Sequence, residues 1–152
     1  MISRIIIFLI LNFGALAIGS ISTKNGVRSE WYGELNKAPW TPPGWVFGAA
    51  WTIIMICFSV YMASLLQSNE DTKLILGLYI LQWVLNVAWN PLFFSFHQIA
   101  IAFIVISVLT LVVGFVLFYY LPVMNVKTAF IVPYFVWLVI ATSLNGYIYI
   151  KN

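Results

Sequence analysis

The sequence predicts an all-α membrane protein, a bundle of five transmembrane helices in a single domain over 1–152, on three observations. Of its 152 residues, 63% are hydrophobic and 7% are charged, whereas a soluble domain carries about 25% charged residues. The mean hydropathy is +1.02. The apolar residues also form five continuous runs, each near the roughly 20 residues that a helix needs to cross a bilayer. A transmembrane β-barrel would instead alternate polar and apolar residues in segments of about ten.

Each run is bounded by polar residues or prolines. The first contains one strongly polar residue, Asn12, and a cleaved signal peptide would look similar; the four spans that follow favour a membrane helix. The polar segment 67–73 separates the second run from the third, and Asp71 or Thr72 is a candidate cap for the next helix. The expected helices are 5–21, 45–66, 74–94, 99–121 and 128–150.

The long first loop, 22–44, is stiff and aromatic. Three prolines fix φ and prevent a helix before Gly44, and tryptophans lie between them. Such a loop at a membrane face is expected to act as a lid over an apolar site. The lid is expected to comprise Trp31 to Pro43, while Trp51, about two turns inside the next helix, is expected to belong to the wall of the site.

The third run carries amide side chains at helical spacing. Gln82, Asn86 and Asn90 share a stripe with Trp89 and Phe93. Amides are costly against lipid, so the stripe is expected to face the bundle interior. For Gln82 and Asn90, hydrogen bonds that only join helices are an equally good explanation. Asn86 lies nearer the middle of the membrane and is the better candidate for a ligand contact.

The fifth run offers a second face toward the same interior. Ala141 is small and leaves room beside Trp137, which predicts a slot for a flat apolar molecule, although ordinary packing of a large against a small residue is the alternative. The residues that share this face are Tyr134, Trp137, Ala141, Leu144 and Asn145.

Several functions are disfavoured by what the sequence lacks. No charged residue lies inside a span away from its ends, which argues against a proton relay, an ion-coupled transporter or a voltage sensor. No cluster of metal-ligating residues is present, so neither a metal nor a bound cofactor is expected. The net charge of +3 comes from scattered residues, which gives no patch for nucleic acid.

Three motifs, in order and at matching spacing over nearly the whole chain, resemble those of the translocator protein family (TspO/MBR). The family is also called the peripheral-type benzodiazepine receptors or tryptophan-rich sensory proteins, and the short termini resemble a bacterial member. The motifs are Trp31-Tyr32 with Leu35, Lys37, Pro39-Trp40, Pro42-Pro43, Trp45 and Trp51; Leu85 to Phe94; and Pro133-Tyr134 through Trp137 to Ala141 and Leu144-Asn145.

This resemblance implies a multi-pass receptor in a bacterial cell membrane, often a homodimer. It implies binding of protoporphyrin IX and of isoquinoline carboxamide or benzodiazepine-type ligands under the first loop. Some bacterial members promote light-dependent porphyrin breakdown, so the porphyrin is expected as ligand or substrate, with Trp51 and Trp137 as the catalytic candidates. Matched by motif, the ligand-binding residues are Tyr32, Pro42, Trp51, Asn86, Trp137, Ala141 and Leu144.

Other functions stay open at this point. A transporter of porphyrin or lipid would need a coupling site that the chain does not offer, and a stress-sensing membrane scaffold would need no small molecule. Animal members carry a sterol-recognition pattern, which Leu144, Tyr147 and Lys151 fit only loosely, so sterol binding is expected to be weak or absent. The pairs Ala15/Gly19 and Gly44/Gly48 allow close helix contacts, either within the bundle or in a dimer.

Overall fold

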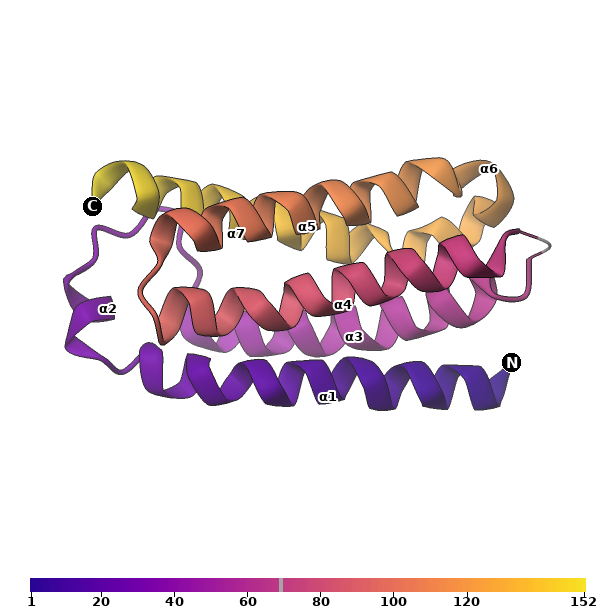
Figure 1. Ribbon diagram of the computed structural model, residues 1–152, viewed down its shortest axis with the longest axis horizontal. Helices are drawn as coiled ribbons and strands as arrows, with labels where there is room; N and C mark the ends of the chain where they lie inside the picture. Colours follow the sequence, from indigo (N-terminus) through magenta and orange to yellow (C-terminus); the bar gives the residue numbers. More distant parts are fainter. Residues whose placement is uncertain (69) are drawn as a thin grey trace.

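The computed structural model describes residues 1–68 and 70–152. Five long helices run side by side, with the two termini at opposite ends of the bundle (Figure 1). Each is long and apolar enough to cross a membrane, which confirms the predicted five-helix bundle and makes the chain a multi-pass membrane protein. These helices are α1 (Ile2–Gly26), α3 (Gly44–Leu65), α4 (Thr72–Phe94), α5 (Ile99–Tyr119) and α7 (Val132–Lys151).

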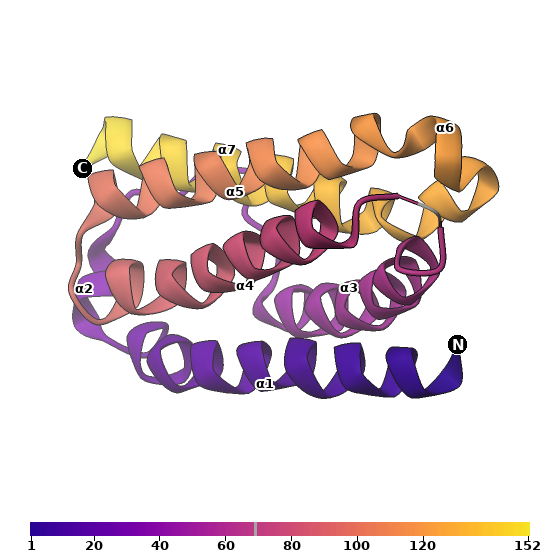
Figure 2. The ribbon, with the colours of Figure 1, turned by 45° about the vertical axis from the view of Figure 1, so that its right-hand side comes forward.

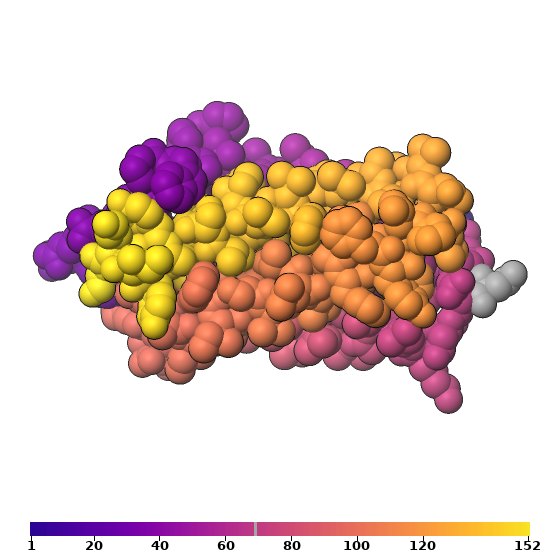
Figure 3. Space-filling model, turned by 90° about the horizontal axis from the view of Figure 1, so that it is seen from above, coloured from indigo at the N-terminus to yellow at the C-terminus, as the bar shows by residue number. Residues whose placement is uncertain are grey.

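The helices pack around a core of large apolar side chains. α1 packs against α3 and α4, and α5 packs against α4 and α7, as the two ribbon views show (Figure 2). Tyr61, Tyr134 and Leu138 are fully buried at the centre, whereas Leu111 on the outer face of α5 is 73% exposed. Apolar side chains on the outside are what a lipid environment requires. From above, α5 and α7 form one continuous outer face (Figure 3).

The first helix is longer than the sequence predicted. The prediction ended it at residue 21, but α1 continues to Gly26. The run of apolar residues ends at residue 21. The polar turn that follows stays helical because it packs on α4. The Thr23 hydroxyl is 2.7 Å from Asn90 Oδ1, to which it donates. A Cβ added at Gly19 would lie 2.6 Å from the Asn90 side chain, so glycine is what allows α1 to approach α4 so closely.

The loop between α1 and α3 contains a short helix that the sequence did not predict, α2 (Glu30–Glu34). The Ser29 hydroxyl accepts the Tyr32 backbone N–H over 3.2 Å and so caps its N-terminus. The backbone is extended at Leu35, ahead of the prolines. The front part of the loop is therefore folded.

The turns at the other end also differ from the prediction. α5 ends at Tyr119, and α6 (Leu121–Met124) and the 3₁₀ helix η1 (Asn125–Phe130) precede α7, which begins at Val132 and not at 128. Asn125 has a positive φ of 45°, which breaks the helix there. Pro133 lies in the first turn of α7, where a missing N–H costs nothing, so it starts the helix and does not kink it.

The polar turn between α3 and α4 ends in the expected cap. Asp71 Oδ1 accepts the Lys73 backbone N–H over 2.9 Å. Asn69, in the middle of this turn, lies outside the described residues. At the opposite end, His97 has a φ of 54° and reverses the chain between α4 and α5.

Candidate functional site

A cavity of about 520 Å³ lies in the half of the bundle nearest the long loop. This volume is typical of sites for drug-sized molecules, which occupy roughly 300–1,000 Å³. All five long helices and the loop contribute to its wall. Because the lining is mainly apolar and aromatic, the cavity suits a ligand with a large apolar body.

Indole rings from three helices form the aromatic wall: Trp51 on α3, Trp89 on α4 and Trp137 on α7. Trp137 packs edge-on against Phe47 with ring centroids 5.3 Å apart, and Trp51 against Tyr134 at 5.9 Å. These contacts hold both indoles in fixed orientations. The Trp89 Nε1 atom is buried and makes no hydrogen bond to any described residue, so it is a donor still to be satisfied.

The amide side chains of α4 differ in their hydrogen bonding. Gln82 and Asn90 bond to other residues of the bundle, whereas Asn86 does not. Gln82 Oε1 accepts the Tyr134 hydroxyl over 2.9 Å and does not line the cavity. Asn90 lines the cavity but is held by Thr23 and by its own bond to the Asn86 carbonyl oxygen. The side chain of Asn86 makes no hydrogen bond to the described residues. It is therefore the amide available to a polar group on a ligand.

The loop forms the roof, and contacts from Trp31, Trp40 and Asn36 help to fasten it to the bundle. The Trp31 ring stacks on His97 with centroids 3.9 Å apart. Trp40 Nε1 donates to Ser143 Oγ over 3.1 Å. The Asn36 backbone N–H donates to Asn152 Oδ1 over 2.9 Å. The loop is thus held over the cavity by contacts to the α4–α5 turn and to α7.

Two roof residues support one another. Lys37 Nζ donates to the Tyr32 carbonyl oxygen over 2.6 Å and lies 4.6 Å from the centroid of the Tyr32 ring. Longer contacts of 3.4 Å reach the carbonyl oxygens of Gly33 and Leu35. The ammonium group therefore stabilises the C-terminal end of α2. Burial raises the pKa of the Tyr32 phenol.

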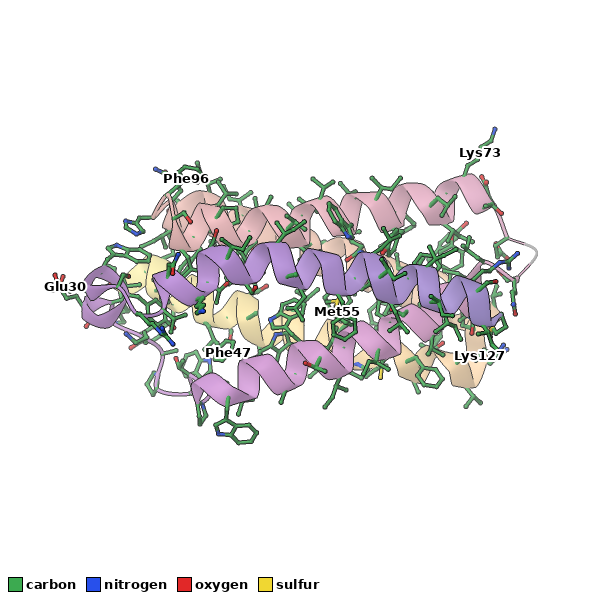
Figure 4. The ribbon with its side chains drawn as sticks, turned by 90° about the horizontal axis from the view of Figure 1, so that it is seen from below. Glu30, Phe47, Met55, Lys73, Phe96 and Lys127 are labelled. Atoms are coloured by element: carbon green, nitrogen blue, oxygen red, sulfur yellow. The ribbon has the colours of Figure 1, made fainter. Side chains whose placement is uncertain are left out.

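The cavity has an open side between α1 and α3. Its exposed lining residues lie at the end of α1 or in the first turns of α3, whereas the other lining residues are buried or half-buried. A Cβ at Gly44 or Gly48 would meet no atom within 4 Å. Figure 4 views the bundle from this side, with Phe47 between the two helices. The exposed lining residues are Ser20, Lys24, Val27, Gly44 and Gly48.

Most of the residues predicted from the sequence meet in this one cavity. Leu144 is buried on α7 but does not line it. The six predicted residues that do are Tyr32, Pro42, Trp51, Asn86, Trp137 and Ala141.

The sequence reasoning missed the contribution of α1 and of three aromatic lining residues, Phe47, Trp89 and Phe94. Phe47 lies one turn before Trp51, and Trp89 lies on the amide stripe, so helical spacing was a sufficient signal for both. On α1 the small residues Ala15 and Gly19 recur at the same spacing. Their pairing is internal, since Gly19 packs on Asn90. In the described part of the chain no three His, Cys, Asp or Glu side chains gather as a metal site would require.

Comparison with known sequences agrees with this architecture. The sequence model of the TspO/MBR family matches residues 6–150. The tryptophan-rich sensory protein of Cereibacter sphaeroides is 34% identical over 116 residues, covering 76% of this chain and 73% of that protein. The human translocator protein is 29% identical, covering 84% and 78%. The tryptophan-rich protein TspO of Bacillus cereus is 25% identical, covering 99% and 97%.

Proposed function

Because the chain belongs to the TspO/MBR family, we propose that it is a membrane receptor that binds a tetrapyrrole such as protoporphyrin IX in the cavity under its first loop. The observation that carries the proposal is the grouping of three indoles around a cavity of about 520 Å³. Flat aromatic ligands stack on such rings or meet them edge-on at centroid distances of 4.5–7 Å. The bacterial relatives support a location in a bacterial cell membrane.

Each part of the wall has a role in this proposal. Trp51 and Trp137 offer apolar faces to the macrocycle, and Ala141 leaves space beside Trp137. Asn86 offers an uncommitted amide to a carbonyl or carboxylate. The same features suit aromatic amides of the isoquinoline carboxamide or benzodiazepine type, which combine flat rings with a carbonyl oxygen.

The test is a titration with protoporphyrin IX, followed by quenching of tryptophan fluorescence in detergent or nanodiscs. We expect saturable quenching that is lost in Ala141→Trp, because the added indole fills the cavity. Trp45→Phe is the control, since Trp45 is 75% exposed and lies outside the lining; it should keep the binding curve. Quenching that never saturates, or that survives Ala141→Trp in a folded protein, contradicts the proposal.

Light-dependent breakdown of the bound porphyrin is a second step of the same proposal. An excited porphyrin takes one electron from an adjacent indole, which leaves a porphyrin radical anion and a tryptophan radical cation. Dissolved dioxygen then adds across a meso-carbon double bond of the reduced macrocycle, and one electron returns from this adduct to the tryptophan radical cation. Cleavage of the O–O bond and of that C–C bond opens the ring and leaves two carbonyl groups, so the net reaction is porphyrin plus dioxygen. Trp51 and Trp137 are the proposed donors, because they line the cavity from two neighbouring helices, α3 and α7, and no acid–base pair is required.

The double variant Trp51→Phe/Trp137→Phe tests this step. Phenylalanine keeps an aromatic face but is a far poorer electron donor. We expect porphyrin binding to stay within about tenfold, or roughly 1.4 kcal/mol, while bleaching under light is abolished. Unchanged bleaching would remove the tryptophans from the reaction and leave the binding proposal intact.

Transport is the main alternative. A transporter needs access to the site from both membrane faces, whereas the exposed lining residues of the described chain all lie on one side opening between α1 and α3. Porphyrin flux into sealed proteoliposomes, measured beside binding in detergent, separates the two functions. A scaffold without small-molecule chemistry would show neither flux nor saturable quenching.

A further inference from the structure

The cavity is positively charged. Its lining contains two lysines, Lys24 and Lys37, and no aspartate or glutamate. This excess of positive charge attracts a negatively charged group on a ligand.

The two lysines differ in what their ammonium groups already bind. Lys37 is bonded to three backbone carbonyl oxygens of the loop. Lys24, in the last turn of α1, makes no hydrogen bond or ion pair to any described residue. It lies at the rim of the side opening and is exposed.

The hydroxyl groups of Ser20, Thr23 and Thr41, which also line the cavity, already donate hydrogen bonds within the protein. Ser20 donates to the Ala17 carbonyl oxygen over 2.7 Å, and Thr41 donates to that of Ala38 over 2.6 Å. The Thr23 hydroxyl donates its one proton to Asn90 Oδ1 over 2.7 Å, and the Gly19 carbonyl oxygen lies 3.1 Å from the same hydroxyl. Among the side chains that line the cavity in the described chain, Lys24 is therefore the cation that can bind an anion without breaking an existing bond.

Resting on the proposed function, we infer that Lys24 determines specificity for a carboxylate on the ligand. The apolar body lies deeper, against Trp51 and Trp137, and the carboxylate lies at the rim. Lysine near the end of a membrane helix extends toward the interface, so the charged pair sits where it keeps part of its hydration. The ligand class is an apolar, flat acid that reaches the site from the bilayer side.

The rival role for Lys24 is that of an ordinary interfacial anchor, which binds lipid phosphates and not the ligand. The two roles predict different dependence on ligand charge. An anchor contributes equally whether or not the ligand carries a carboxylate.

The experiment compares protoporphyrin IX with its dimethyl ester, which has the same macrocycle and no free carboxylate. Both are titrated into the full chain in nanodiscs of a zwitterionic phospholipid. The variants are Lys24→Gln, Lys24→Arg and the control Arg28→Gln. Arg28 is exposed at the same end of the bundle, four residues further on, but lies outside the lining.

We expect the unmodified protein to bind the diacid about fivefold more tightly than the diester, which is the range for a partly hydrated ion pair. Lys24→Gln should remove that preference and leave the diester unchanged, while Lys24→Arg and Arg28→Gln should keep the preference. Equal effects of Lys24→Gln on both porphyrins, or none on either, overturn the inference alone. If neither porphyrin binds the unmodified protein, the proposed function fails and the inference fails with it.

Discussion

The indole of Trp31 lies flat on the imidazole of His97, with ring centroids 3.9 Å apart and planes 14° apart. Trp31 belongs to the loop over the cavity, and His97 forms the turn between α4 and α5. The contact therefore fastens this loop to a part of the bundle far from it in sequence. Since the ring of Phe93 also packs edge-on against Trp31 at 5.6 Å, the indole is held on two sides.

Trp31→Ala should loosen the lid and speed ligand release. Aromatic pairs contribute about 0.5–1.5 kcal/mol, so the dissociation rate of a bound porphyrin should rise by about three- to tenfold. Stopped-flow fluorescence of the porphyrin-loaded protein measures that rate. Trp45→Ala, which removes an exposed indole that packs against neither Trp31 nor His97, should leave it unchanged; an equal acceleration in both variants would refute the lid role of Trp31.

Replacing Pro42 and Pro43 by glycine should weaken ligand binding. Each proline restricts the open loop, and its loss adds about 0.4–1 kcal/mol of conformational freedom that closure must remove. The double variant should lose about four- to thirtyfold in porphyrin affinity, as measured by fluorescence titration. Pro122→Gly makes the same kind of change at the opposite end of the bundle and should have no effect on affinity. If Pro42→Gly/Pro43→Gly binds as tightly as Pro122→Gly, the loop is not a lid.

The sequence predicted the features that local patterns of residues determine, and it did not predict those that depend on contacts between distant residues. Continuous apolar runs gave the five spans, and helical spacing placed Trp51, Asn86, Trp137 and Ala141 on interior faces that do meet. The extension of α1 to Gly26 was not predictable from hydropathy, because it depends on Gly19 and Thr23 packing on Asn90. The sequence favoured Asn86 as the ligand contact but left the role of Gln82 open, because its partner Tyr134 is 52 residues away in the chain.

Gly19→Ala should destabilise the bundle, whereas Gly14→Ala on the same helix should not. A Cβ at position 19 would lie 2.6 Å from Asn90 Nδ2, while at position 14 it would meet nothing within 4 Å. Forcing α1 from α4 should cost about 1–3 kcal/mol and break the bond from Thr23 to Asn90. At Gly14 the better helix propensity of alanine should be neutral or favourable by up to about 1 kcal/mol.

Thermal unfolding in detergent, followed by circular dichroism, measures both glycine variants. The expected result is a lower midpoint for Gly19→Ala and an equal or higher one for Gly14→Ala. Similar midpoints for the two would mean that α1 can move away from α4 at little cost. The internal role assigned to the Ala15/Gly19 pair would then be wrong.

Gly48→Leu should block the side opening between α1 and α3. Position 48 is exposed, lines the cavity and has open space around its Cβ, so leucine can be accommodated without disturbing a helix contact. A ligand dissolved in the bilayer would then meet a branched side chain at the entrance. We expect the association rate of protoporphyrin IX to fall by about tenfold, which corresponds to roughly 1.4 kcal/mol of added barrier.

Gly77→Leu on α4 is the matched control, because Gly77 is equally open at its Cβ but does not line the cavity. If both leucine variants slow association equally, leucine has a general effect on the protein. If Gly48→Leu leaves the association rate unchanged and Trp31→Ala raises it, the ligand enters under the lid instead.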